Sequence, residues 1–268
     1  MNVLVIGDSM SFPVDDSRQS FRDAWPQLVL RSMIEQGQEI GCFWYRSRGG
    51  STVGDVLRDL RRLRVGMGGP RASHEFDLTI CQVGAVDCFP RPYPKWFYDM
   101  LMSGGIGRQC LRRIHRHYGA LSRAYGQTWT SERGWVRGLR KLIDQLRTVS
   151  KSNLFIEIAP PGAYLRDKAD RVASKVDDYN RLLRDVVLGY GSARLKTINP
   201  YQGSSAESLL IWDGTHLSNE GHRTVAASVL QAADFACGSR LRDEASAALR
   251  TPNTDDPTLP DPALPITY

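Results

Sequence analysis

The first ten residues constrain the fold of this chain more than any other stretch. Val3–Ile6 is apolar and rich in β-branched side chains, and Gly7, Asp8 and Ser9 follow it directly. Such a run is typical of a strand buried on both faces, as in a parallel sheet covered by helices. In open α/β sheets, functional residues lie beyond the carboxyl ends of the strands. We therefore expect Ser9 at the mouth of a crevice, although Asp8 and Ser9 alone also suit a turn or a helix cap.

Strands and helices are predicted to alternate along most of the chain. Further strands are expected at Glu39–Tyr45, Phe76–Val83, Asn153–Ala159 and Arg194–Ile198, and helices at Phe21–Gln36, Val53–Val65, Arg133–Ser150, Lys168–Leu188 and Glu220–Ala236. Five strands separated by helices predict a three-layer α/β/α fold around a doubly wound parallel sheet. The 268 residues are enough for one such domain, placed at 1–238. Residues 239–268 are rich in proline and lack apolar periodicity, which predicts a mobile tail.

Composition narrows the class of protein further. The five cysteines are odd in number and form no Cys-x-x-Cys pair, which argues against a disulfide framework or a structural zinc site. No apolar run approaches the roughly 18 residues of a membrane span. The first strand is expected to start at residue 2, which leaves no room for a removable signal peptide. These features predict a cytoplasmic protein that does not associate with membranes.

The alternation is lost between residues 88 and 132. This segment contains three prolines, the aromatic cluster Tyr93–Tyr98 and a predicted basic helix at Gly107–Arg123. It is too long for a simple connection, so we expect an insertion after the third strand. The segment from Cys88 to Arg147 contains twelve Lys or Arg residues and only three acidic residues. Its surplus of positive charge exceeds the net charge of the whole chain, which is +6. The insertion and the helix that follows it therefore carry the positive charge of the protein.

A second chemical motif, Asp213–Gly214–Thr215–His216, precedes the last predicted helix. A hydroxyl nucleophile needs a base within hydrogen-bond reach and a third group that orients the base. Asp213 and His216 are three residues apart, so one helical turn would place them on a common side. The topology returns this segment to the carboxyl edge of the sheet, where Ser9 is expected. In isolation, Asp213 and His216 are better interpreted as caps of the last helix, since Asp213 favours its positive end.

Four motifs, taken in order, resemble those of the SGNH, or GDSL-type, hydrolase family. They are Gly7–Ser9, Gly49–Thr52, Gly84–Asp87 and Asp213–His216, and together they span residues 1 to about 236. The resemblance implies a flavodoxin-like sheet and a serine esterase mechanism that requires no metal or organic cofactor. It implies Ser9 as the nucleophile, His216 as the general base and then acid, and Asp213 as the orienting carboxylate.

The resemblance also implies an oxyanion hole, and here the sequence departs from the family. The expected donors are the N–H groups of Ser9 and Gly50 and an asparagine side chain, but Val86 stands at the asparagine position. Losing one oxyanion donor can cost on the order of 100- to 1,000-fold in rate. Three outcomes follow: another donor replaces it, for example from the insertion; the enzyme is slow or uses a reactive acyl donor; or the domain binds a ligand without turning it over.

Four other residues near the motifs are expected to have supporting or structural roles, not catalytic ones. Asp8 and Asp87 are expected to support the site, and Asp87 also suits an ion pair with Arg91 or a cap. His222 lies within the last predicted helix and is expected to be structural. Cys88 is expected to be buried, because no histidine partner can be assigned to it.

The insertion suggests a kind of substrate. A run of charges is usually a solvated surface, but a segment that leaves the third strand emerges beside the predicted active site. We hypothesise that Arg112, Arg113 and Arg116 belong to a lid or rim whose positive potential favours an anionic substrate. Candidates are an acidic or phosphorylated glycan, an acyl-coenzyme A and an acyl-carrier protein. Nucleic acid is a weaker prediction, because no zinc-finger spacing, RNA-recognition signature or basic region with heptads is present.

These patterns favour a serine esterase that removes an O-acyl group, foremost acetyl, from a sugar or a biosynthetic intermediate through an acyl-Ser9 intermediate. An acyltransferase that uses the same three residues would share every step up to deacylation. A non-catalytic domain that binds an anionic ligand is the third interpretation, motivated by Val86.

Overall fold

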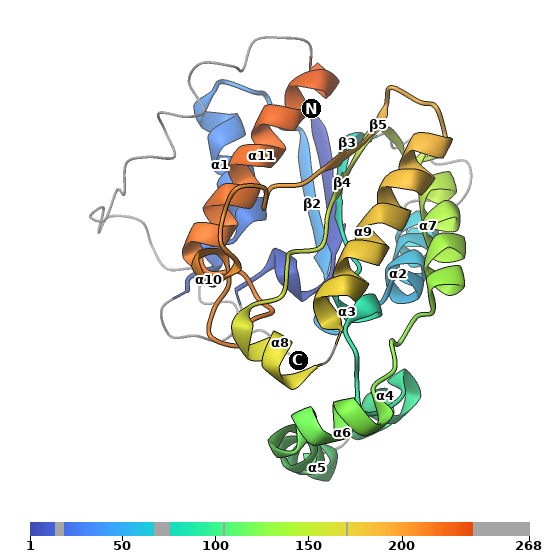
Figure 1. Ribbon diagram of the computed structural model, residues 1–268. Helices are drawn as coiled ribbons and strands as arrows, with labels where there is room; N and C mark the ends of the chain where they lie inside the picture. The colour runs from blue at the N-terminus through green and yellow to red at the C-terminus, as the bar shows by residue number, and fades with distance from the viewer. Residues whose placement is uncertain (14–18, 67–75, 104, 170, 238–268) are drawn as a thin grey trace.

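The computed structural model describes residues 1–13, 19–66, 76–103, 105–169 and 171–237. For some residues within helices, it describes the backbone but not the side chain. Five parallel strands form one sheet in the order β2-β1-β3-β4-β5 (Figure 1). They are β1 (Asn2–Gly7), β2 (Cys42–Ser47), β3 (Phe76–Gln82), β4 (Ser150–Ile156) and β5 (Leu195–Ile198). This is the flavodoxin-like strand order, whose functional edge lies at the carboxyl ends of the strands. The predicted five-stranded α/β fold is confirmed.

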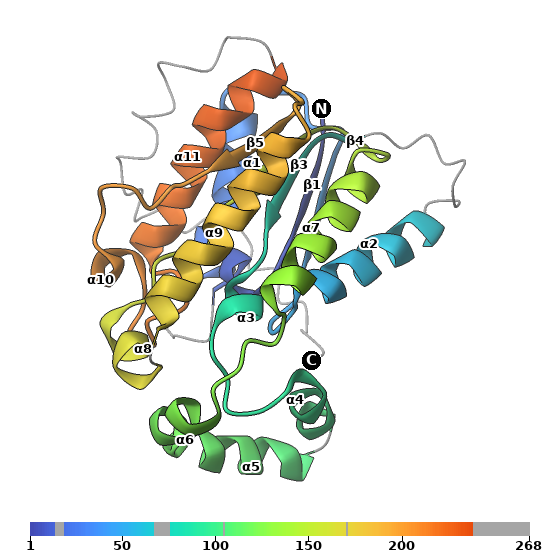
Figure 2. The same ribbon diagram turned by 45° about the vertical axis from the view of Figure 1, so that its right-hand side comes forward.

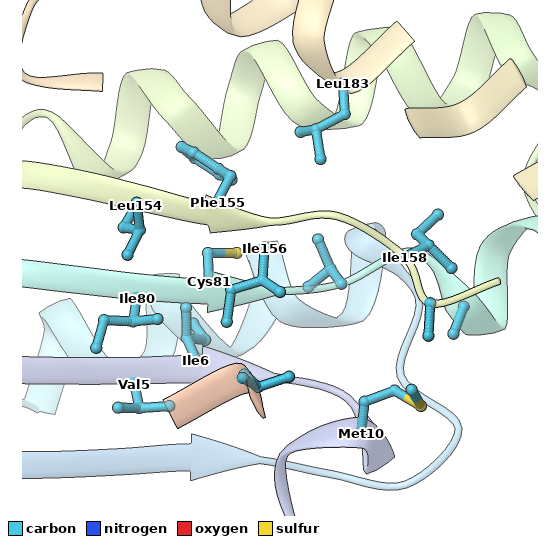
Figure 3. Packing of buried hydrophobic residues seen from close by; sticks show 14 of the residues in the cluster. Val5, Ile6, Met10, Ile80, Cys81, Leu154, Phe155, Ile156, Ile158 and Leu183 are labelled. Atoms are coloured by element: carbon cyan, nitrogen blue, oxygen red, sulfur yellow. The ribbon is translucent and has the colours of Figure 1, made fainter. Parts of the chain in front are cut away.

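Helices cover both faces of the sheet. One face is covered by α1 (Trp25–Glu35) and α11 (Asn219–Cys237), and the other by α2 (Val53–Gly66), α7 (Glu132–Leu146) and α9 (Val172–Gly189) (Figures 1 and 2). Because helices lie on both sides, the central strands β1 and β3 are buried at nearly every position, whereas the edge strand β2 is partly exposed and β4 begins with polar residues. Val3–Ile6 of β1 is at most 1% exposed at every position. Figure 3 shows this packing, with Leu154 and Phe155 of β4 beside the β3 residues and Leu183 of α9 above them.

The alignment of the strand ends positions the site. In the sheet register, Gly7 at the end of β1 lies opposite Ser47 of β2 and Gln82 of β3. The segments that follow these three residues therefore leave the sheet at one common edge. They carry Ser9, Gly50 and Val86, respectively.

Four predicted helices differ from the structure. Phe21–Gln36 begins as a separate 3₁₀ turn, η2 (Phe21–Asp23), and α1 starts only at Trp25 because Ala24 is extended. Gly107–Arg123 is two helices, α5 (Gly105–Arg116) and α6 (Tyr118–Tyr125), because His117 leaves the helical backbone conformation and Tyr118 is buried with its hydroxyl on the Pro90 carbonyl. Lys168–Leu188 is divided between α8 (Ala163–Lys168) and α9, since Arg171 has a φ of 62°. The helix predicted at Arg133–Ser150 ends at Leu146, and Ser150 already belongs to β4.

Some strand bounds and one loop also differ. The second strand starts at Cys42 rather than Glu39, and the fourth covers Ser150–Ile156 rather than Asn153–Ala159. The predicted loop at Tyr201–Leu210 contains a short helix, α10 (Ala206–Leu209).

The segment predicted as an insertion is helical. After the short helix α3 (Ala85–Cys88), it forms α4 (Lys95–Met102), α5 and α6, which lie beyond the carboxyl ends of the strands (Figure 2). At its base, Arg91 and Gln127 exchange two backbone hydrogen bonds, of 2.9 and 3.0 Å. The two chain segments that enter and leave the insertion are therefore paired with each other.

Among the described residues, no helix is both long enough and apolar enough to cross a membrane. Four cysteines, Cys42, Cys81, Cys88 and Cys110, are free thiols. The predicted tail, 239–268, lies outside the described residues.

Candidate active site

Ser9 lies on a short 3₁₀ turn, η1 (Ser9–Ser11), directly after β1. Asp8 caps this turn, since its carboxylate accepts a hydrogen bond of 3.0 Å from the Met10 N–H. The Asp8 N–H donates to the carbonyl of Gln82 at 3.0 Å, which ties the turn to the end of β3. A side chain at Gly7 would come within 2.5 Å of the same carbonyl, so only glycine fits there. Ser9 is thus held at the carboxyl edge of the sheet by its immediate neighbours.

Asp213 and His216 lie on the loop between α10 and α11. The loop is closed by a bridge between Leu210 and Leu217 and by a hydrogen bond of 2.9 Å from the Ile211 N–H to the His216 carbonyl. Within it, Asp213 Oδ1 accepts from the N–H groups of Thr215 and His216, at 2.8 and 3.0 Å. The two side chains are therefore brought together by a turn that Asp213 itself closes, and not by the helical turn that the spacing suggested.

The structure brings Ser9, His216 and Asp213 together, although they come from opposite ends of the domain. His216 Nε2 lies 3.0 Å from Ser9 Oγ, and His216 Nδ1 lies 2.6 Å from Asp213 Oδ2. A carboxylate at Nδ1 favours the tautomer that carries its proton there. That tautomer leaves the Nε2 lone pair facing the Ser9 hydroxyl. The imidazole can therefore accept the hydroxyl proton.

The electrostatics of the carboxylate suit this arrangement. Burial acts to raise the pKa of Asp213, but the hydrogen bond and charge of His216 and the backbone N–H donors outweigh it and hold that pKa below its ordinary value. The side chains of Asp213 and His216 are each 21% exposed. Asp213 therefore stays ionised at neutral pH and stabilises an imidazolium beside it.

Gly50 lies in a tight turn next to the end of β1. The Ser51 N–H donates to the Arg48 carbonyl at 3.3 Å, and Gly50 has a φ of +71°, which favours glycine. The Arg48 N–H donates to the Gly7 carbonyl at 3.4 Å, which joins this turn to β1. A Cβ atom on Gly50 would lie 3.3 Å from the ring of Tyr98 and 3.4 Å from its hydroxyl. Tyr98 of α4 thus packs directly on Gly50.

Val86 lies in α3 and is 4% exposed. Its side chain has no donor, so the amide that the resemblance implied is missing at this position. The preceding Gly84 has a φ of +118°, and a Cβ there would come within 2.7 Å of Ile158. The backbone that presents Val86 therefore requires glycine before it.

Asp87 and Asp8 are both fully buried. Asp87 accepts two hydrogen bonds, of 3.0 and 3.2 Å, from the Val53 N–H and a third from the Thr130 hydroxyl. Burial raises the pKa of Asp87 to about 8 against the effect of these donors. Asp87 therefore joins α3 to the start of α2 and to the end of the insertion.

Asp8 lies closer to the reactive groups. Burial raises the pKa of Asp8 to about 6, against the Met10 N–H donor and the charge of His216. The ion pair considered between Asp87 and Arg91 is not formed. The guanidinium of Arg91 lies over the ring of Trp129, 5.1 Å from its centroid.

The basic residues assigned to substrate binding lie apart from these groups. Arg113 and Arg116 are exposed on α5, and the structure shows no contact between them and Ser9, Asp213 or His216. Figure 2 shows α5 at the end of the insertion that is remote from the sheet. The side chain of Arg112 lies outside the described residues.

A different helix of the insertion, α4, reaches the site. Besides the contact of Tyr98 with Gly50, Lys95 Nζ lies 3.4 Å from Asp55 Oδ2 at the start of α2. The sequence pattern does not single out Lys95 or Tyr98. The aromatic cluster Tyr93–Tyr98 was the signal, but its spacing does not show which ring faces the sheet.

An exposed aromatic pair lies next to Asp213, and no sequence pattern pointed to it. Trp212 is 74% exposed, and its ring makes an edge-on contact with Tyr164 of α8, with 6.0 Å between the ring centroids. The Gly162 N–H donates to the Gly214 carbonyl at 2.9 Å, so the start of α8 is attached to the loop that carries Asp213 and His216.

His222 and Cys88 are buried, as expected of structural residues. His222 Nδ1 accepts from the Trp25 N–H at 3.3 Å, and burial lowers the pKa of His222 to about 4. Burial also raises the pKa of the Cys88 thiol well above its ordinary value. In the described parts of the chain, no three His, Cys, Asp or Glu side chains gather where they could hold a metal ion.

The fold resembles those of several solved hydrolases. A lipase/acylhydrolase from Enterococcus faecalis matches with a TM-score of 0.58 and 14% identity, over 91% of this chain and 100% of that one. A carbohydrate acetylesterase family member from Sinorhizobium meliloti matches with a TM-score of 0.56 and 16% identity, over 89% and 100%. An acetyl xylan esterase variant from Geobacillus stearothermophilus matches with a TM-score of 0.53 and 16% identity, over 90% and 97%.

At these identities, the structural matches establish the fold. No curated protein sequence matches the chain. The sequence model of the GDSL-like lipase/acylhydrolase family, however, matches residues 5–224, which include the Ser9 turn, the Gly50 turn and the Asp213–His216 loop. This chain therefore belongs to the GDSL-like lipase/acylhydrolase family, whose members hydrolyse ester bonds.

Proposed function

We propose that this protein is a serine esterase that removes O-acetyl groups from a carbohydrate. The observation that carries the proposal is the continuous hydrogen-bonded chain from Ser9 Oγ to His216 Nε2, at 3.0 Å, and from His216 Nδ1 to Asp213 Oδ2, at 2.6 Å. A nucleophile, a base and an orienting carboxylate in this order are what acyl transfer to a hydroxyl requires.

The reaction has two halves. Ser9 Oγ attacks the ester carbonyl carbon while His216 Nε2 takes the hydroxyl proton, and the N–H groups of Ser9 and Gly50 stabilise the oxyanion. The tetrahedral intermediate expels the sugar oxygen, which receives the proton from His216, and leaves acetyl-Ser9. A water molecule then attacks the acetyl carbonyl as His216 removes its proton. Collapse of the second intermediate releases acetate and returns the proton to Ser9.

A carbohydrate substrate is supported by the surface beside the loop of Asp213. Trp212 is 74% exposed and Tyr164 is 43% exposed, and the two form an aromatic pair next to the orienting carboxylate. Large exposed aromatic surfaces mark binding sites, and an aromatic face packs well on the apolar face of a sugar ring. Two of the solved structures with this fold are a carbohydrate acetylesterase family member and an acetyl xylan esterase variant.

Labelling with a fluorophosphonate tests the nucleophile. We expect one label per chain on Ser9, no labelling of Ser9→Ala, and slow labelling of His216→Ala because the hydroxyl then lacks its base. Ser20→Ala, which removes an exposed serine elsewhere, serves as the control and should label like the natural chain. Folded protein that does not label, or a Ser9→Ala variant that still does, would exclude the esterase mechanism.

A panel of esters tests the substrate. We expect faster turnover of acetylated oligosaccharides than of longer acyl esters. Trp212→Ala should raise KM for an acetylated oligosaccharide about tenfold and change kcat/KM for p-nitrophenyl acetate less than twofold. Trp44→Ala, on β2, is the matched control. Equal losses on both esters would contradict a sugar platform at Trp212. Release of the acyl group to a hydroxyl acceptor, and not to water, would instead identify an acyltransferase.

A further inference from the structure

The oxyanion hole of the proposed esterase lacks one donor, because Val86 cannot donate a hydrogen bond. The inference that follows rests on the proposed function, and it concerns how this chain completes the hole. The remaining donors, the N–H groups of Ser9 and Gly50, belong to two turns joined by the hydrogen bond from Arg48 to Gly7. A donor that replaces the missing amide would therefore have to lie next to one of these turns.

Tyr98 lies in that position. Its hydroxyl is 3.4 Å, and the nearest ring carbon 3.3 Å, from the point where a Cβ on Gly50 would lie. A Cβ at this position would push Tyr98 away by a few tenths of an ångström, so glycine permits the close packing of the ring. Tyr98 belongs to α4 of the insertion, so a helix outside the central sheet brings a hydroxyl to the glycine whose N–H is expected to bind the oxyanion.

The ring of Tyr98 is held in place from several sides. It stacks on Tyr93, with 6.3 Å between centroids and 4° between planes, and it packs against Trp129 at 5.0 Å. Lys95 Nζ lies 5.9 Å from its centroid and also pairs with Asp55 at the start of α2. A donor that is fixed before the reaction costs no reorganisation when the oxyanion forms.

Other polar side chains near Gly50 already have partners. Arg48 Nε donates to Ser51 Oγ at 3.3 Å, and Lys95 pairs with two carboxylates, those of Asp55 and Asp99. Within the described residues, by contrast, the Tyr98 hydroxyl makes no hydrogen bond, and its ring is half-buried. Its proton is therefore free to be donated to a substrate.

We propose that the Tyr98 hydroxyl donates the third hydrogen bond to the oxyanion, in place of the amide that Val86 lacks. Tyrosine hydroxyls are among the donors that stabilise oxyanions in enzymes. The insertion would then be part of the catalytic site, since it completes the hole that the sheet edge leaves open. It would also make correct docking of α4 a condition for turnover.

Tyr98→Phe tests this proposal, because it keeps the ring and removes the hydroxyl. For hydrolysis of p-nitrophenyl acetate, we expect kcat to fall about 100-fold, with KM changed less than threefold, as for removal of one oxyanion donor. The affinity for a trifluoromethyl ketone, which forms a tetrahedral adduct with the nucleophile, should fall in parallel with kcat/KM. Tyr190→Phe, which removes a hydroxyl at the end of α9, is the matched control and should leave kcat unchanged.

A second variant separates a lost donor from a disturbed helix. Val86→Asn places an amide at the position where the family has one, and in the Tyr98→Phe background it should restore kcat at least tenfold. The proposal is overturned if Tyr98→Phe keeps kcat within threefold of the natural chain, or if kcat falls without a matching loss of ketone affinity. Failure of the proposed function would look different, because the natural chain itself would then resist the fluorophosphonate and Ser9→Ala would have no effect on turnover.

Discussion

At the level of single residues, the site is assembled from side chains that also shape their own turns. Asp213 binds two backbone N–H groups with one oxygen and His216 Nδ1 with the other. Asp8 likewise caps the turn that presents Ser9. Each carboxylate therefore has a structural and an electrostatic role, and a substitution that removes the charge but keeps the shape can distinguish the two.

Asp213→Asn is such a substitution. The asparagine oxygen can still accept the N–H groups of Thr215 and His216, so the loop should keep its shape. The imidazole, however, loses the charge that stabilises its protonated form and fixes its tautomer. We expect kcat/KM for an acetyl ester at pH 7 to fall on the order of 10⁴-fold, as for other triads of this kind.

The pH profile provides a second readout of the same variant. Because the pKa of Asp213 lies below its ordinary value, the carboxylate of the natural chain stays charged down to mildly acidic pH. The activity lost in Asp213→Asn should therefore be lost across the whole range from pH 5 to 8. Asp178→Asn, an acidic residue on α9, is the control. A loss of less than tenfold would show that Asp213 does not orient the base.

The sequence predicted the residues of the Ser9, His216 and Asp213 motifs because each lies in a short, ordered pattern next to a strand or helix. Tyr98 could not be predicted in this way. Its contact with Gly50 joins the turn after β2 to α4, and α4 is held there by the ion pair of Lys95 with Asp55 and by the packing of Tyr98 on Trp129. Local periodicity contains no information about such contacts.

At the level of helices and strands, Asp87 joins three elements. Its carboxyl group contacts the first N–H of α2 from within α3, and it accepts the Thr130 hydroxyl at the end of the insertion. A buried acid in this position should make stability depend on pH. Burial raises the pKa of Asp87 to about 8, so between pH 4 and 8 the folded chain holds a proton that the unfolded chain has lost.

Asp87→Asn tests this linkage. Because the folded state binds more protons, the free energy of unfolding of the natural chain should fall as pH rises from about 4 to about 8, by at most about 1.4 kcal/mol per pH unit from this group. Asp8 adds a change of the same sign up to about pH 6. Urea unfolding at pH 5, 6, 7 and 8 should show Asp87→Asn gaining stability relative to the natural chain as pH rises. Parallel curves for the two proteins would contradict the raised pKa of Asp87.

The differences between predicted and observed elements have local causes. β4 starts at Ser150 because it pairs with β3, where Phe76 lies opposite Ser150. The polar Ser150–Asn153 stretch does not look like a buried strand, so the apolar pattern shifted the prediction toward Ala159. The helix predicted at Gly107–Arg123 is broken because Tyr118 is drawn to the Pro90 carbonyl, a partner 28 residues away in sequence.

At the level of the whole molecule, the insertion extends across the carboxyl edge of the sheet. Its first helix, α4, is tied to α2 through Lys95 and Asp55, and its last helix, α6, packs against α8 (Figure 2). The insertion is thus anchored on both sides of the segments that carry Ser9 and His216. Its surplus of positive charge lies in a position where it can act on an approaching substrate through its field rather than by contact.

Replacing Arg113 and Arg116 by alanine tests whether that field matters. Both side chains are exposed, so the double variant should fold normally. At low salt we expect kcat/KM to fall roughly threefold to tenfold for an anionic acetyl ester and to stay unchanged for a neutral one. The reason is that exposed positive charges attract an anionic substrate and speed its association, but exert no such attraction on a neutral substrate. The difference should shrink at high ionic strength, where the screening length is about 3 Å at 1 M salt.

The matched control removes the same charge elsewhere. Arg181→Ala combined with Arg223→Ala takes two arginines from α9 and α11, and both of these side chains are about half exposed or more. If the two double variants lowered kcat/KM for the anionic ester equally, net charge alone would explain the effect. If neither distinguished anionic from neutral esters, the positive surface of α5 would have no role in substrate selection. Only a selective loss with Arg113 and Arg116 would support an anionic substrate guided by the insertion.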